Sequence, residues 1–166
     1  AAAHFQAYLE WTLDARNTWS RVFALCGLGR VALAGGDHDA ARERFHEALV
    51  LTRASGRRDL EGLPLGCVAH LAAAAGHAPL ATHLATTVTA SPFTWLETRL
   101  WVGELVVEGS RAGAGQRTSG RAGEVSDEAA GGGQDEMGMV IDALLAVEGP
   151  TTAEWLSAAS GVFAPL

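Results

Sequence analysis

The sequence contains no lysine, so all twelve of its basic residues are arginine. Nineteen aspartate and glutamate residues outnumber these arginines, and the formal net charge is −7. A chain with this excess of negative charge repels the phosphate backbone of nucleic acids. We therefore expect no nucleic-acid partner for this segment.

Cysteine is nearly absent too, since only Cys26 and Cys67 occur. Both fall within apolar helical pattern, which predicts two buried, reduced thiols and a cytoplasmic protein. No basic stretch followed by an apolar run resembles a signal peptide. The most apolar run, 63–76, includes His70 and is too short to span a bilayer. We expect a soluble protein that makes no contact with a membrane.

The usual motifs of catalysis and metal binding are also missing. The six histidines show no HxxxH or HExxH spacing, and the two cysteines lie far apart, so we expect no metal site. Neither a GxSxG nucleophile elbow nor a phosphate-binding loop occurs. The sequence therefore predicts no enzymatic activity and no cofactor.

What the sequence does contain favours helices. Alanine and leucine, two of the best helix formers, are abundant, and aromatic residues make up only 7%. A shift of the chain by 40 residues against itself also reveals a repeat. The aligned positions are Ala1, Phe5, Tyr8 and Leu9 with Ala41, Phe45, Ala48 and Leu49, and Leu25, Val31, Ala32 and Gly36 with Leu65, Leu71, Ala72 and Gly76.

Each repeat unit has the same design. An apolar helix ends at Gly36 or Gly76, because glycine can take the left-handed conformation that closes a helix. A polar turn follows, and the second helix places Ala41, Phe45 and Ala48 on one face. Such a helix pair cannot bury its apolar face alone, so neighbouring pairs must stack.

The repeat resembles a known family. The residues that match the tetratricopeptide pattern are Leu25, Leu28, Gly29, Ala32, Gly36, Ala41, Phe45 and Ala48. The stretch 27–37 is also similar to the helical repeats of large bacterial LuxR-type and signal-transduction ATPase regulators. The resemblance implies an all-α fold in which antiparallel helix-turn-helix repeats stack as a short right-handed α-solenoid.

Three regions follow from this register. We expect residues 1–108 to form the repeats, with the first repeat truncated because 1–14 corresponds only to a second helix. Residues 109–135 hold many glycines and form a flexible loop. Residues 136–166 form C-terminal helices that pack on or cap the stack. The segment 136–148 has two interpretations: it is the second helix of an interrupted third repeat that begins with 92–108, or a separate docking helix.

The resemblance also implies a concave groove lined by the first helices. Its candidate binding residues are Phe23, Arg30 and Leu33 in one repeat and Leu63 and His70 in the next. Arg30 and His70 are equivalent residues, and both could donate hydrogen bonds to a carboxylate or backbone carbonyl. Alternatively, Glu104 and Glu108 form local ion pairs with Arg30 and His70.

The function implied by this groove is binding of a protein or peptide segment, within a larger cytoplasmic bacterial regulator. Two alternatives stay open, a sensor domain for a small molecule or peptide and an accessory domain of an enzyme. An open, polar-lined concave face favours the binding module. A closed apolar pocket lined by aromatic residues favours the sensor.

Overall fold

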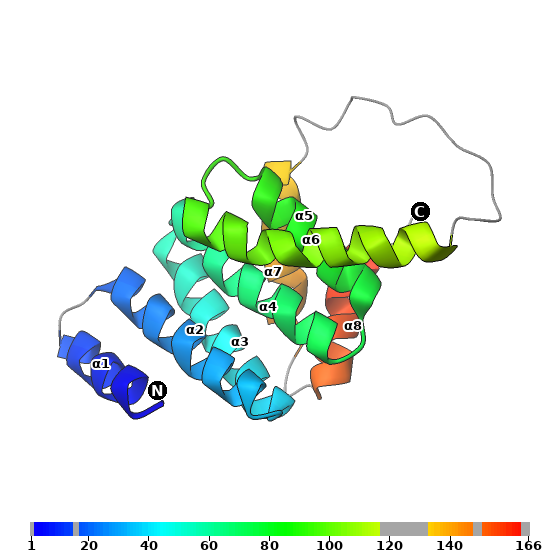
Figure 1. The fold of residues 1–166 in the computed structure, drawn as a ribbon. Helices are drawn as coiled ribbons and strands as arrows, with labels where there is room; N and C mark the ends of the chain where they lie inside the picture. Colours follow the sequence, from blue (N-terminus) through cyan, green and yellow to red (C-terminus); the bar gives the residue numbers. More distant parts are fainter. Residues whose placement is uncertain (1, 15–16, 117–132, 148–150, 164–166) are drawn as a thin grey trace.

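The computed structural model describes residues 2–14, 17–116, 133–147 and 151–163 (Figure 1). These ranges contain α-helices and one 3-10 turn, and none of them contains a strand. The elements are α1 (Ala2–Asp14), α2 (Thr18–Ala34), α3 (His38–Ser55), η1 (Arg58–Leu60), α4 (Gly62–Ala74), α5 (Ala78–Ala90), α6 (Leu96–Gln116), α7 (Gly133–Leu145) and α8 (Thr152–Val162). The all-α prediction is confirmed.

The helices form layers (Figure 1). One layer consists of α2, α4 and α6, and α3 and α5 lie behind it. Helices α7 and α8 pack together on α3 and α5, while α1 packs against α2 at one edge. Adjacent helices from α1 to α6 thus pack on each other in chain order. None of the helices in the described ranges is both long and apolar enough to cross a bilayer.

The two predicted glycine turns close in the same way. Gly36 and Gly76 have φ angles of 80° and 84°. After them, the Asp37 N–H donates to the Ala32 carbonyl at 3.0 Å, and the His77 N–H donates to the Ala72 carbonyl at 2.8 Å. The shared bond pattern reflects the 40-residue repeat of the sequence. Asp37 also caps α3, because its carboxylate accepts from the Ala40 N–H at 2.9 Å.

Close packing of α2 depends on two glycines. A Cβ atom added at Gly29 would overlap the ring of Phe45 in α3, and one added at Gly27 would overlap the ring of Phe5 in α1. Each glycine therefore makes room for an aromatic ring from a neighbouring helix. Phe45 is completely buried.

The same packing makes Ala41 sensitive to size. Its side chain on α3 is completely buried. Replacing Ala41 with leucine should force neighbouring side chains out of their preferred rotamers and lower the free energy of unfolding by about 1–3 kcal/mol. Thermal or urea unfolding measures this change. An unchanged midpoint would contradict the helix register described above.

The C-terminal helices are bound by specific contacts. Trp155 of α8 is completely buried, and its indole N–H donates to the Leu144 carbonyl of α7 at 2.9 Å. The Thr152 hydroxyl donates to the Asp39 carboxylate of α3 at 2.7 Å. Helix α7 packs against α8, α3 and α5, and these contacts favour a docking helix over the second helix of a repeat that begins with 92–108. The apolar face of α7 covers the back of the α3–α5 layer instead.

Helix α6 differs from its predicted bounds at both ends. It begins at Leu96 rather than at 92, because the chain first makes a turn in which the Thr94 N–H donates to the Ser91 carbonyl at 3.3 Å. It then continues to Gln116, since alanine, arginine and glutamine between the glycines favour a helix. The predicted flexible loop, 109–135, therefore overlaps α6 and α7, and its middle part, 117–132, lies outside the described residues.

Candidate functional site

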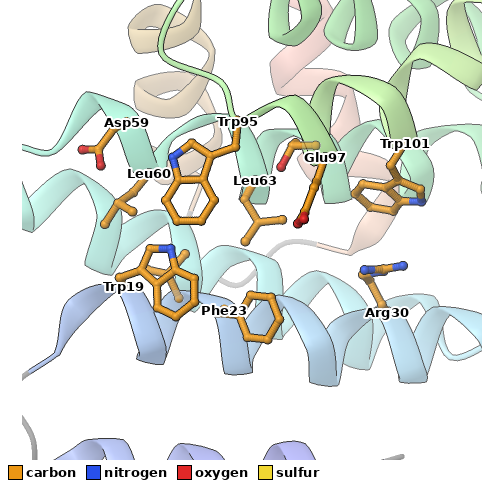
Figure 2. A pocket seen from close by; sticks show the side chains of 11 residues that line it. Trp19, Phe23, Arg30, Asp59, Leu60, Leu63, Trp95, Glu97 and Trp101 are labelled. Atoms are coloured by element: carbon orange, nitrogen blue, oxygen red, sulfur yellow. The ribbon is translucent and has the colours of Figure 1, made fainter.

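A cleft of about 480 Å³ lies between α2 and α6, with α4 and η1 as its floor (Figure 2). Its volume falls within the range of about 300–1,000 Å³ that is typical of ligand pockets. The lining residues are Trp19, Val22, Phe23, Arg30, Asp59, Leu60, Leu63, Trp95, Glu97, Thr98 and Trp101.

Two side-chain stacks cross the cleft, one toward each end (Figure 2). In the first, the rings of Trp19 and Trp95 stack with their centroids 5.5 Å apart and their planes 22° apart. In the second, the guanidinium of Arg30 lies 4.3 Å from the ring centroid of Trp101. The ring of Phe23 also stacks on Trp19, with a centroid distance of 5.4 Å and an interplanar angle of 13°. Four of the eleven residues that line the cleft are thus aromatic.

Charged groups occupy two further positions in the cleft. Asp59 accepts hydrogen bonds from the guanidinium of Arg57, and these bonds lower the pKa of the Asp59 carboxyl. The Glu97 side chain extends from α6 toward α2 (Figure 2), and it forms no ion pair within the described part of the chain. Of these two carboxylates, Glu97 is therefore the one available to a ligand.

The predicted pair, Arg30 and His70, meets at one indole. The His70 ring stacks on Trp101 with a centroid distance of 4.0 Å and an interplanar angle of 16°, and Arg30 lies against the same indole. Among the described ion pairs, none joins Arg30 or His70 to Glu104 or Glu108. Arg30 thus lines the cleft, whereas His70 is not among the lining residues and contacts one of them, Trp101.

Their chemistry differs, however. Arg30 is exposed and carries a permanent charge. His70 is half-buried, and burial lowers the pKa of its imidazole below the usual range, more than the other influences on it. His70 is consequently mostly neutral near pH 7, so Arg30 is the one of the two side chains that carries a positive charge there.

The other predicted groove residues separate into two groups. Phe23 and Leu63 line the cleft with Arg30. Leu33 is half-buried against the hydrophobic core and is not among the described lining residues. The prediction of groove residues did not include Trp19 or Trp95. The sequence feature that could have indicated these two residues is the rarity of tryptophan, which occurs five times in the chain.

The cysteines offer no catalytic group. Cys26 and Cys67 are both buried and form no disulfide. Burial raises the pKa of the Cys26 thiol, and its hydrogen bond with Cys67 raises it further, so Cys26 remains a thiol rather than a nucleophilic thiolate. Across the described ranges, no three histidine, cysteine or acidic residues lie close enough to hold a metal ion.

Comparison of the chain with protein-family models, with curated proteins and with solved structures gave no match. The function must therefore be argued from the cleft itself.

Proposed function

We propose that this chain is a binding module that holds a short segment of a partner protein in the cleft between α2 and α6. The observation that carries the proposal is the combination of aromatic walls with the exposed guanidinium of Arg30. Aromatic side chains in a cleft provide a large contact area for an apolar anchor residue. A guanidinium beside them binds a carboxylate or a backbone carbonyl.

We further propose that α2 to α5 are stacked tetratricopeptide-like repeats, wound as a right-handed solenoid, within a larger cytoplasmic bacterial regulator. Support comes from the equivalent turns at Gly36 and Gly76 and from the layer of α2, α4 and α6 (Figure 1). In this interpretation the cleft is the concave groove, and occupancy of the groove is relayed to other domains.

A second candidate function is sensing of a small planar molecule. The cleft is favourable for this role because stacks toward both ends delimit it and because its volume suits a drug-sized ligand. A planar ligand would lie inside the cleft beside Phe23 and would make no contact with the protein surface outside the cleft. A peptide segment would instead extend beyond the two stacks.

Substitution of Arg30 tests the proposed function. The probe is a fluorescent peptide pool with one phenylalanine or tryptophan next to aspartate or glutamate, compared with a pool that has asparagine or glutamine instead. Arg30→Ala should weaken binding of the acidic pool about tenfold or more, because one charge-assisted bond is worth about 1.5–3 kcal/mol. Fluorescence anisotropy measures the affinities.

The control is Arg44→Ala, which removes an exposed arginine of α3 that lies outside the lining of the cleft. It should leave binding unchanged. Equal affinity for the acidic and the amide pools would contradict the assigned role of Arg30. Binding of planar small molecules but of neither pool would favour the sensor.

A further inference from the structure

The outward face of α6 carries an apolar stripe that no described helix covers. Leu96, Leu100, Gly103 and Val107 follow one another at spacings of four, three and four, which places them on one face. The side chains of Leu96, Leu100 and Val107 are 69%, 67% and 49% exposed. Exposed apolar stripes of this kind mark interaction surfaces.

Gly103 lies in the middle of this stripe and has no packing role within the described structure. At Gly29 an added Cβ would overlap the ring of Phe45, and at Gly66 it would lie 2.7 Å from Val102. At Gly103 it would meet nothing within 4 Å. Glycine disfavours a helix interior, so the absence of a side chain here leaves a gap without an intramolecular benefit.

The gap is part of a surface hollow of about 490 Å³. Its lining residues are Arg99, Leu100, Gly103, Glu104, Val107 and Glu108. The missing side chain at Gly103 thus leaves space at the centre of the stripe. In the same way, the missing side chain at Gly29 leaves space on α2 for the ring of Phe45.

One edge of the hollow is acidic. Glu104 and Glu108 are exposed and lie four residues apart, so they follow the same side of α6. Neither glutamate forms an ion pair within the ranges that the structure describes. A partner with positive charges along the matching edge would neutralise both.

We propose that this face of α6 binds one amphipathic helix of a partner protein. That helix inserts a large apolar side chain over Gly103 and lays basic residues along Glu104 and Glu108. Helix α3 packs on α2 in the corresponding way, with Phe45 over Gly29. A second copy of α6 fits less well, because its own Glu104 and Glu108 would add negative charge to the interface.

Peptides based on α3, His38–Ser55, provide the probe, because this helix carries both Phe45 and arginines. All three peptides have asparagine or glutamine in place of Asp39, Glu43 and Glu47, so that the arginines give a net positive charge. The first peptide has no further change, the second also has alanine in place of Phe45, and the third also has glutamate in place of Arg42, Arg44 and Arg53. All three are stabilised as helices and carry a fluorophore. The first should bind the full chain saturably, and the other two should bind at least tenfold more weakly.

Variants of the chain locate the binding surface. Gly103→Leu should fill the hollow and weaken binding of the first peptide at least tenfold, with an unchanged circular dichroism spectrum. Gly161→Leu is the matched control, because a Cβ at this exposed glycine of α8 also meets nothing within 4 Å. Glu104→Arg with Glu108→Arg should reverse the preference, so that the third peptide binds more tightly than the first.

Several outcomes would overturn the proposal. The first is a lack of saturable binding by the first peptide, and the second is an equal loss of binding in the two glycine variants. The third is concentration-dependent dimerisation of the chain that Gly103→Leu abolishes, because a second copy would then be the occupant. Analytical ultracentrifugation measures that association. Binding that Arg30→Ala weakens but Gly103→Leu does not would place the peptide in the cleft instead.

Discussion

Replacing Phe45 with alanine is expected to lower the free energy of unfolding by about 3–5 kcal/mol. The Phe45 side chain is completely buried, and its ring fills the space that Gly29 leaves on α2. Alanine would leave a cavity there, because backbone atoms of two packed helices cannot collapse into it. A domain is stable by only about 5–15 kcal/mol, so this one change removes a large fraction. Urea unfolding followed by circular dichroism measures it.

Phe93→Ala is the matched control for this experiment. The Phe93 side chain is 43% exposed and lies in the turn before α6. Its replacement should change the free energy of unfolding much less than the replacement of Phe45, because substitutions at the surface usually change it within about 0.5 kcal/mol. Similar losses in the two variants would show that the α2–α3 contact is not a principal source of stability.

Replacing Trp155 with alanine should detach α7 and α8 from the rest of the protein. The indole is completely buried, and its N–H group donates to the Leu144 carbonyl. The loss should cost about 3–5 kcal/mol. Helix α8 has only 11 residues, and helices shorter than about 12–15 residues are marginal on their own. Hydrogen exchange should show faster exchange in α7 and α8 than in α2 to α5.

Two further variants show the origin of this effect. Trp155→Phe keeps an aromatic ring but leaves the buried Leu144 carbonyl without its donor, which should cost about 1–3 kcal/mol for that carbonyl. Trp11→Ala removes an indole that is 66% exposed and should have little effect. If Trp155→Ala instead accelerated exchange equally in all helices, α7 and α8 would belong to one cooperative unit with the others.

The helices could be predicted from the sequence because local signals define them. Gly36 and Gly76 end helices at equivalent positions, and both adopt the left-handed conformation that the sequence implied. The partner of α7 could not be predicted in this way. The spacing of Met137, Val140 and Ile141 shows which face of α7 is apolar. It does not show which other helix covers that face.

The residues of the candidate site could likewise be predicted only in part from the sequence. Phe23, Arg30 and Leu63 line the cleft, and the resemblance to tetratricopeptide repeats implies that these residues share one surface. Trp95 precedes α6 in a turn, where helical periodicity gives no position for a side chain. Its stack on Trp19 is a tertiary contact between residues with no fixed spacing. The cleft wall therefore became visible only in the structure.

The contact between α8 and α3 also determines the order in which the molecule can fold. The bond from Thr152 to Asp39 joins residues that are 113 positions apart, whereas α2 with α3 and α4 with α5 are neighbours in the chain. Contacts between distant residues form slowly, because a long loop must close before they gain any energy. We therefore expect the paired helices to assemble first and to supply the surface on which α7 and α8 dock. A chain emerging from the ribosome would build this surface before α8 has been synthesised.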